Sequence, residues 1–139
     1  MERSLVLIKP DAMERGLAGT ILSRLQSLGL KLVALKMLHM DKALAREHYA
    51  IHKDKPFFNR LVDYISSAPI VAAVFEGEGA IESIRKAMGP TDPAKAEAGT
   101  IRGDFGLDIE RNTIHGSDSL ETAEMETRLF FSEDEIFSY

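Results

Sequence analysis

Three short runs of hydrophobic residues set the strongest constraint on how this chain can fold. They extend over residues 5–9, 31–40 and 70–75. Each run is rich in leucine, valine or isoleucine and has glycine or proline close by, which is typical of strands buried in a sheet. The chain is therefore expected to contain a sheet, and an all-helical bundle is excluded.

The segments between these runs show helical patterns. Residues 21–29 carry hydrophobic side chains at i, i+1, i+4 and i+7 and end in a glycine, which describes an amphipathic helix. Further helices are predicted over residues 41–49, 57–66, 79–88 and 119–130. The alternation of strands and helices favours two βαβ-like halves in an α+β sandwich.

Residues at the predicted helix starts support these assignments. Asp41 is a favoured N-cap residue, and Pro56 precedes its helix where proline suits a first turn. Asp118 and Glu121 have the spacing of a capping box before the last helix. Residues 89–111 lack a sustained period and contain several glycines and prolines, so we expect a long functional loop there.

Length and composition narrow the function classes. The 139 residues suit one domain, spanning 1–139, and include no cysteine, which excludes disulfides, thiolate zinc sites and thiol catalysis. The formal net charge of −5 argues against a nucleic-acid binder, which usually carries a basic face. No run approaches the roughly 20 apolar residues of a membrane helix, so we expect a soluble cytoplasmic protein.

The segment Asn112-Thr113-Ile114-His115-Gly116-Ser117-Asp118 is the most informative part of the chain. It places a histidine in a short β-favouring stretch, followed by a glycine and small polar residues. A neutral imidazole is a competent nucleophile near pH 7. Gly116 is expected to leave the neighbouring backbone open to a bulky anion. A single histidine is more often a satisfied core or surface residue, and the surrounding motifs argue otherwise.

Seven motifs along nearly the whole chain resemble those of nucleoside diphosphate kinases. They are Leu7-Ile8-Lys9-Pro10-Asp11 with Arg15-Gly16-Leu17, His48-Tyr49, Pro56-Phe57-Phe58, Pro69-Ile70-Val71-Ala72, Gly89-Pro90-Thr91-Asp92-Pro93, Gly99-Thr100-Ile101-Arg102-Gly103-Asp104-Phe105, and the histidine segment with Ser119 and Glu121. The resemblance implies a ferredoxin-like α+β sandwich, an antiparallel sheet covered by helices. It also implies γ-phosphoryl transfer, mainly from ATP, to nucleoside diphosphates through a phosphohistidine at His115, in a ping-pong mechanism.

The resemblance also implies the phosphate and ribose contacts. Phosphoryl transfer depends on positioning and positive charge around the moving group. Lys9, Arg85 and Arg102 match the family's phosphate-binding cations, and Thr91 is expected to donate from its hydroxyl. Asn112 and Lys9 match ribose contacts. In a regular strand an odd offset would put Asn112 and His115 on opposite faces, so a bend between them is required.

Further residues are assigned by the same resemblance. Glu126 matches the glutamate that hydrogen-bonds the catalytic imidazole, and Ser117 and Tyr49 match residues that line the pocket and orient this pair. Phe57 matches the aromatic residue that stacks on the base, with Ile109 covering its other face. Stacking tolerates every base, so broad base specificity is implied. We expect Phe57 to be exposed and its neighbour in the core.

Metal binding is expected only through the nucleotide. His48 and His52 have the i, i+4 spacing of a zinc pair, but no further ligand is obviously placed to complete a site, so we interpret them as a surface-helix pair. Magnesium is expected on the nucleotide phosphates, with Asp118 contacting it through water.

Two alternatives to the kinase interpretation remain. One is a catalytically idle nucleotide-binding or scaffolding member of the fold, against which the complete set of site residues argues. The other is a phosphotransfer signalling domain, which the predicted strands oppose. Nucleoside di- and triphosphates are the expected partners. A homo-oligomer, tetramer or hexamer, is implied by the family.

Overall fold

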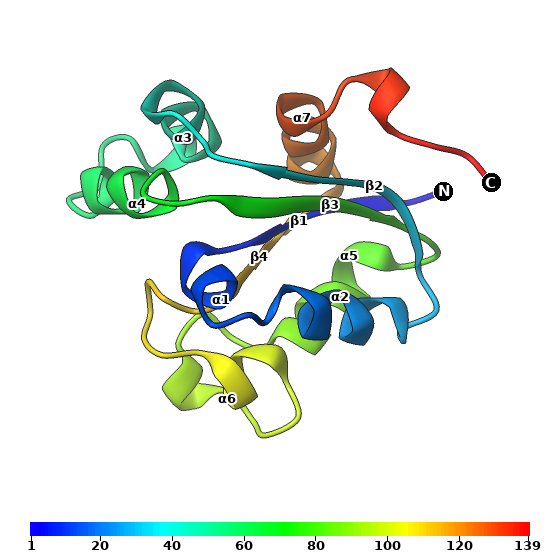
Figure 1. Cartoon of the computed structure of the whole chain (residues 1–139), viewed down its shortest axis with the longest axis horizontal. Coiled ribbons are helices and arrows are strands. Elements are labelled where there is room, and N and C mark those ends of the chain that lie inside the picture. Colours follow the sequence, from blue (N-terminus) through cyan, green and yellow to red (C-terminus); the bar gives the residue numbers. More distant parts are fainter.

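An antiparallel four-stranded sheet forms the middle of the molecule, in the order β2-β3-β1-β4 (Figure 1). The computed structural model describes all residues 1–139. The strands are β1 (Arg3–Ile8), β2 (Lys31–Leu38), β3 (Ile70–Glu76) and β4 (Ile114–Gly116). Three of them coincide closely with the predicted hydrophobic runs, and the fourth is the short strand at His115.

Seven α-helices pack against this sheet in two layers (Figure 1). Helices α3 (Lys42–His48), α4 (Phe58–Ile65) and α7 (Leu120–Phe130) cover one face. Helices α1 (Pro10–Glu14), α2 (Ala18–Gln26), α5 (Ala80–Met88) and α6 (Ile101–Phe105) cover the other. This arrangement confirms the expected ferredoxin-like α+β sandwich.

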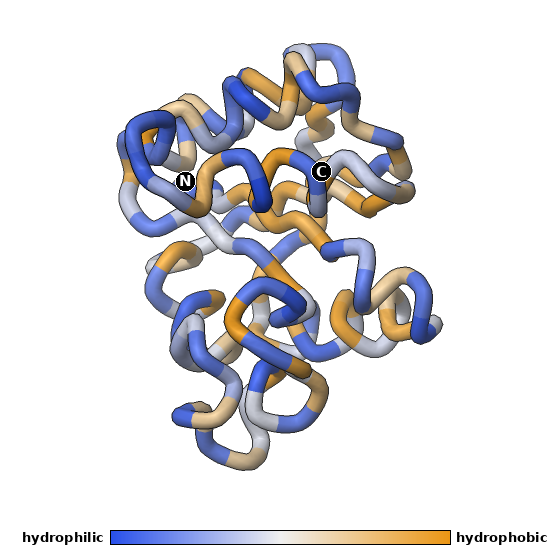
Figure 2. Tube along the Cα trace, turned by 90° about the vertical axis from the view of Figure 1, so that its left-hand side faces the viewer, coloured by the Kyte–Doolittle hydropathy of each residue, from blue (hydrophilic) through white to orange (hydrophobic).

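Alternation along β1 explains how one strand serves both layers. Leu5 and Leu7 point into the core under α3, α4 and α7, whereas Val6 and Ile8 point into the core under α1, α2 and α5. Successive strand side chains face opposite sides of a sheet, so β1 is hydrophobic on both faces from Leu5 to Ile8. Figure 2 shows hydrophobic stretches of the trace in the middle of the molecule, with hydrophobic and hydrophilic residues alternating along the outer segments.

Pairing with β1 fixes the position of the candidate nucleophile. β4 runs antiparallel to β1, with His115 opposite Leu7 and Gly116 opposite Val6. On the other side of β1, Leu7 is opposite Ala72 of β3. His115 therefore lies on the edge strand, beside the rigid centre of the sheet.

Several element boundaries differ from the predictions. The short helix α1 directly after β1 was not predicted. The expected loop 89–111 contains the 3-10 turn η2 (Pro93–Lys95) and the helix α6, which Thr100 caps by accepting from the Gly103 amide. Helix α7 is capped by Ser119, which accepts from the Thr122 amide at 3.1 Å, so the capping box predicted from Asp118 is wrong. Asp41 caps α3 as predicted.

No helix of the structure is both long and apolar enough to span a bilayer.

Candidate active site

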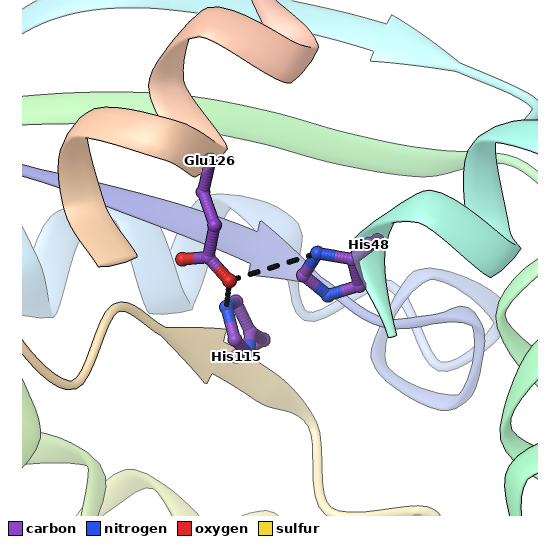
Figure 3. Close-up of side chains that lie close together, drawn as sticks. All are labelled: His48, His115 and Glu126. Atoms are coloured by element: carbon purple, nitrogen blue, oxygen red, sulfur yellow. Dashed lines mark hydrogen bonds and ion pairs between the residues drawn. The ribbon is translucent and has the colours of Figure 1, made fainter. Parts of the chain in front are cut away.

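The His115 imidazole is held by the carboxylate of Glu126. The two side chains come from β4 and α7, and Nε2 of His115 lies 2.8 Å from Oε2 of Glu126 (Figure 3). A carboxylate only accepts hydrogen bonds, so Nε2 carries the ring proton and donates it. The Nδ1 lone pair is consequently free, and a quarter of the His115 side chain is exposed. The predicted contact between the two side chains is present, and it leaves Nδ1 as the ring nitrogen with an available lone pair.

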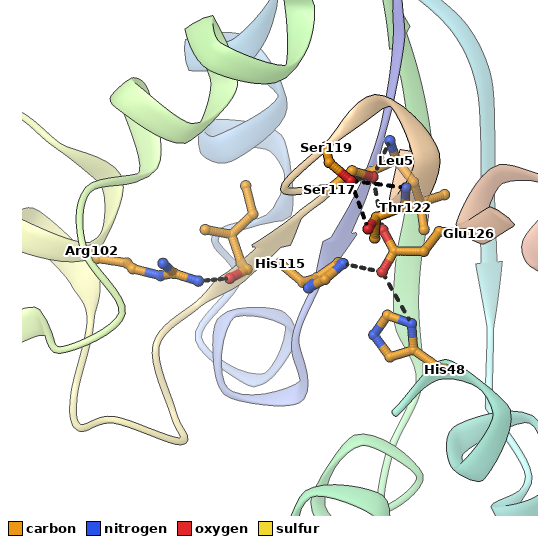
Figure 4. A network of polar contacts seen from close by, with 9 residues as sticks. Leu5, His48, Arg102, His115, Ser117, Ser119, Thr122 and Glu126 are labelled. Carbon is orange, nitrogen blue, oxygen red and sulfur yellow. Dashed lines mark hydrogen bonds and ion pairs between the residues drawn. The ribbon is translucent and has the colours of Figure 1, made fainter. Parts of the chain in front are cut away.

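Ser117 fixes the other oxygen of the carboxylate. Its Oγ donates to Oε1 of Glu126 at 2.8 Å and accepts from the backbone amide of Leu5 at 3.1 Å (Figure 4). Glu126 and Ser117 are both buried. A buried carboxylate with each oxygen bonded to a different side chain cannot rotate freely, and the hydrogen bond from the Leu5 amide ties Ser117 to β1.

His48 is not the surface residue that its sequence context suggested. Its side chain is 1% exposed, and Nδ1 lies 3.6 Å from Oε2 of Glu126, the same oxygen that His115 contacts (Figure 3). The ring centroid is 4.7 Å from that of His115, at an interplanar angle of 84°. Neither ring nitrogen has a hydrogen-bond partner. An unpaired buried polar group costs about 1–3 kcal/mol, so this placement calls for an explanation.

Burial first, and then the neighbouring charges of His115, Lys9 and His52, hold the pKa of His48 well below its ordinary value. His48 is therefore a neutral ring at physiological pH. Burial also raises the pKa of Tyr49, whose ring packs 4.6 Å from that of His48. The Tyr49 hydroxyl makes no hydrogen bond to the His115–Glu126 pair in this structure.

The structure corrects the assessment of possible metal ligands. One possible ligand atom from each of His48, His115 and Glu126 lies within 4.8 Å of the others. His48 therefore has two potential metal ligands beside it that its sequence context did not reveal. A nitrogen of each histidine ring faces the same atom, Oε2 of Glu126, so a carboxylate oxygen already lies between the two rings (Figure 3). His52 lies outside α3, in the 3-10 turn η1 (Ala50–His52), with its ring against Phe57, so the predicted i, i+4 pair does not form.

The bend required between Asn112 and His115 occurs at Thr113. Its φ angle is 73°, in the left-handed region that a β-branched residue rarely adopts. The backbone amide of Thr113 donates to Oδ2 of Asp11 at 3.1 Å, and Oδ1 of Asp11 accepts from the Tyr64 hydroxyl at 2.6 Å. Asp11, at the start of α1, thus stabilises a strained backbone that turns Asn112 toward the site. Sequence reasoning missed Asp11 as a support and Tyr64 altogether.

Lys9 and Asn112 meet at the end of β1. Nζ of Lys9 donates to Oδ1 of Asn112 at 2.7 Å and to the Glu110 carbonyl at 2.9 Å. The Asn112 amide donates to the carbonyls of Thr91 and Ile109. Burial, followed by the charge of Arg102, lowers the pKa of Lys9 to about 8. One proton of the ammonium and one lone pair of Oδ1 remain free for a ligand.

Arg102 ties the loop before β4 to the strand itself. From α6, its guanidinium donates to the carbonyls of Gly89, Asn112 and Ile114, and Figure 4 shows it approaching from the side opposite Glu126. Burial, with Arg85 second, lowers the pKa of Arg102 to about 10, so it stays charged at neutral pH. Arg102 therefore combines a structural role with a positive charge at the site.

A single pocket brings together most of the predicted site residues. It is lined by Lys9, Tyr49, Arg85, Thr91, Arg102, Ile109, Asn112, His115 and Asp118 among others. Asp118 is the one acidic residue in this lining. Glu126 and Ser117 lie behind His115. The pocket thus combines three cations with the free nitrogen of an imidazole, as an anionic substrate requires.

Phe57 differs from its predicted environment. It is half-buried rather than exposed, and its ring lies 5.6 Å from that of His52, which does line the pocket. Phe58 packs against the core under α3, α4 and α7 but keeps partial exposure. Helix α4 begins at Phe58, so Pro56 precedes the helix instead of occupying its first turn.

Gly116 has a packing role that the sequence did not reveal. A Cβ built on Gly116 would lie 2.6 Å from Sδ of Met88 and 3.3 Å from Cγ2 of Ile84. Any larger residue here would have to displace Met88, because α5 packs closely against β4. Gly116 also lines the pocket beside His115, and the expectation that its backbone is open to an anion stays a prediction.

Comparison with known proteins shows which family the chain resembles along its whole length. The family model described as "Nucleoside diphosphate kinase" matches residues 2–136. A nucleoside diphosphate kinase of Dehalococcoides mccartyi is 62% identical over 100% of this chain and 98% of its own length. Another, from Archaeoglobus fulgidus, is 55% identical over 100% and 92%.

Solved structures give the same result. The Aquifex aeolicus nucleoside diphosphate kinase superposes with a TM-score of 0.96 at 46% identity, covering 98% of this chain and 99% of the other. A halophilic nucleoside diphosphate kinase from Halobacterium salinarum in complex with CDP gives 0.97 at 48% identity, covering 99% and 92%.

Proposed function

The chain belongs to the nucleoside diphosphate kinase family, and we propose that His115 is the residue on which it carries the phosphoryl group from one nucleotide to another. The observation that supports this most directly is the 2.8 Å hydrogen bond from Nε2 of His115 to Glu126, which leaves Nδ1 unprotonated beside the cationic pocket. The substrates are nucleoside triphosphates, mainly ATP, as donors and nucleoside diphosphates as acceptors.

Transfer takes place in two half-reactions. The Nδ1 lone pair attacks the γ-phosphorus, an N–P bond forms, and the bond to the β,γ-bridging oxygen breaks, so that its electron pair leaves with the diphosphate. The ring gains positive charge while its proton stays on Nε2, and Glu126 stabilises that charge across 2.8 Å. A second diphosphate then takes the phosphoryl group by the reverse steps.

The pocket cations stabilise the transferring group. Arg85 and Arg102 approach from α5 and α6, and Thr91 belongs to the loop that Asn112 holds through its amide. Arginine matches phosphate oxygens with two parallel hydrogen bonds, which fixes orientation as well as charge. Because the electrostatic term dominates such reactions, these residues act mainly on turnover.

Lys9 and Asn112 supply a ready-made ribose site. A 3′-hydroxyl can accept from the remaining proton of Lys9 Nζ while it donates to the second lone pair of Asn112 Oδ1, 2.7 Å away. The amide donors of Asn112 are already used on backbone carbonyls, so the oxygen is the atom that reads the sugar.

The base is held by stacking rather than by reading its edge. Ile109 lines the pocket and is 59% exposed, and Phe57 lies against His52, which also lines the pocket. Stacking on an aromatic ring is open to every base, so this arrangement supports broad base specificity.

Magnesium would be carried by the nucleotide. With Asp118 as the only carboxylate in the pocket lining, the donor set fits an ion that keeps most of its ligands from phosphates and water, and Asp118 would contact it through water. When bound, the ion supplies charge neutralisation to the phosphates.

The proposed enzyme is a homo-oligomer. Leu35 and Met37 lie on β2, the edge of the sheet, and are 50% and 63% exposed. An exposed hydrophobic edge strand favours association with another chain.

Light scattering coupled to size exclusion gives the subunit number, tetramer or hexamer. A monomer at working concentration contradicts the assignment.

Labelling of the protein tests the function. Incubation with γ-labelled ATP and magnesium should give a phosphoramidate that is stable in alkali, lost in mild acid and assigned by NMR to Nδ1 of His115. His115→Asn should lose both the label and turnover. A label that survives in this variant, or that resists acid, shows that another residue carries the phosphoryl group.

A further inference from the structure

His48 is a buried titratable side chain of the site that the proposed mechanism leaves unused. It is the last residue of α3, and its ring packs edge-on against both His115 and Phe130 at angles of 84° and 77°. Both of its nitrogens are buried without a hydrogen bond. A leucine or phenylalanine would fill this space without burying polar atoms, so packing alone does not account for a histidine here.

The orientation of the His48 ring explains why a histidine occupies this position. His48 Nδ1 points at Oε2 of Glu126 from 3.6 Å, and Nε2 of His115 meets the same oxygen at 2.8 Å (Figure 3). The first distance is slightly longer than a hydrogen bond, so a shift of a few tenths of an ångström would let His48 donate. Ser117 already holds the other oxygen. His48 is thus the third donor available to this carboxylate.

We propose that His48 is a positioning residue for phosphoryl transfer: its ring limits rotation of the His115 imidazole, and its Nδ1–H holds Oε2 of Glu126 on the Nε2 side. This rests on the proposed function of His115. If the carboxylate or the ring turned, the proton could move to Nδ1 and remove the nucleophilic lone pair. His48 thereby favours the one tautomer that can attack.

The charges around His48 suit a neutral donor. Glu126 on α7 is the acidic group that faces it, whereas Lys9, His115 and His52 approach from the end of β1, from β4 and from η1. Burial first, and then these basic groups, disfavour a charged ring, so His48 carries one proton and can present it to the carboxylate.

Variants of His48 separate positioning from packing. His48→Leu removes the ring and the donor. His48→Asn keeps a donor close to the position of Nδ1. His39→Leu is the matched control, since His39 lies away from the site and contacts the Ser66 carbonyl. The measurement is single-turnover phosphorylation at saturating ATP, together with the ATP dissociation constant and the thermal midpoint of each variant.

In His48→Leu we expect phosphorylation to slow about tenfold, while ATP binding changes less than about twofold, because misplacement of reacting groups falls on the chemical step. His48→Asn should recover most of the rate. A His48→Leu enzyme as fast as the wild type, or a His48→Asn enzyme as slow as His48→Leu, overturns the proposal.

Nitrogen-15 NMR of the wild-type protein gives a test that needs no variant. It should find the proton of His48 on Nδ1 and that of His115 on Nε2. A proton on Nε2 of His48 contradicts the proposal even if His48→Leu fails to fold. If wild-type protein forms no phosphohistidine at His115, the proposed function itself fails. A normal phosphoenzyme with unaffected His48 variants overturns only the role of His48.

Discussion

The ammonium of Lys9 lies 2.7 Å from the side-chain oxygen of Asn112, although 103 residues separate them in the chain. The contact joins the end of β1 to the segment that precedes β4. Each residue keeps part of its hydrogen-bonding capacity, and together they form a polar pair ready to receive a hydroxyl group. The charge of Lys9 and the placement of the pair around a hydroxyl group lead to separate predictions.

The rate at which ATP phosphorylates the enzyme should fall as Lys9 loses its charge. Burial, then the charge of Arg102, lowers the pKa of Lys9 to about 8, so the ammonium is complete well below pH 8 and lost above it. We expect kcat/KM for ATP to fall on the alkaline side with a midpoint near this value, measured between pH 6 and 10. In Lys9→Arg the charge persists, so this limb should disappear whatever the absolute rate. An identical limb in both proteins assigns it to another group.

Dideoxynucleotides should bind but transfer slowly. A 3′-hydroxyl that accepts from Lys9 can turn its single proton from Oδ1 of Asn112 toward the bridging oxygen as charge develops there, and such an interaction strengthens in the transition state. Single-turnover phosphorylation of the enzyme at saturating nucleotide should be fast with ATP and with dATP, and slow with ddATP. Equal rates for dATP and ddATP would reduce this pair to a binding role.

Glu126→Gln should lower turnover more than binding. The glutamine keeps the size and a hydrogen-bonding oxygen but loses the charge that stabilises the imidazole as Nδ1 attacks. We expect kcat to fall about 10²-fold with KM changed little, which is the pattern for an interaction made mainly in the transition state. Exposed Glu124→Gln, on the same helix, is the control. A normal kcat in Glu126→Gln would show that Glu126 does not contribute to the chemical step.

Phe57→Ala should weaken all nucleotides to a similar degree. Loss of a base–aromatic stack costs about 1–3 kcal/mol and does not depend on base edges. Dissociation constants for ADP, GDP, CDP and UDP measured by calorimetry give the comparison. If one base alone loses affinity, the pocket contains an edge contact not assigned here.

Gly116→Ala should destabilise the fold. The new methyl group would meet Met88 Sδ at 2.6 Å, and overpacking of this kind costs about 1–3 kcal/mol. Urea unfolding should show a lower midpoint at an unchanged slope. Combining Gly116→Ala with Met88→Ala, which frees the space, should cost less than the sum of the two changes. Strict additivity would show that the two residues do not compete for this space.

Local patterns were sufficient for most of the fold. Hydrophobic runs and helical periods predicted three strands and the main helices, and Asp41 was recognised as a cap because a cap acts within its own turn. The segment around His115 and the partner Glu126 were found through a resemblance that extends along the chain. The order of these motifs was enough to predict one pocket.

Tertiary packing decided what no local pattern contains. The exposure of His48 depends on α7 and β4 covering the end of α3, so its spacing from His52 suggested a surface pair that the fold does not form. The left-handed Thr113 depends on a carboxylate 102 residues away, and Met88 of α5 fills the space beside Gly116. The sequence by itself determined which elements form and which residue types reach the site. Only the tertiary structure determined which nitrogen of His115 is free, because that depends on contacts between side chains far apart in the chain.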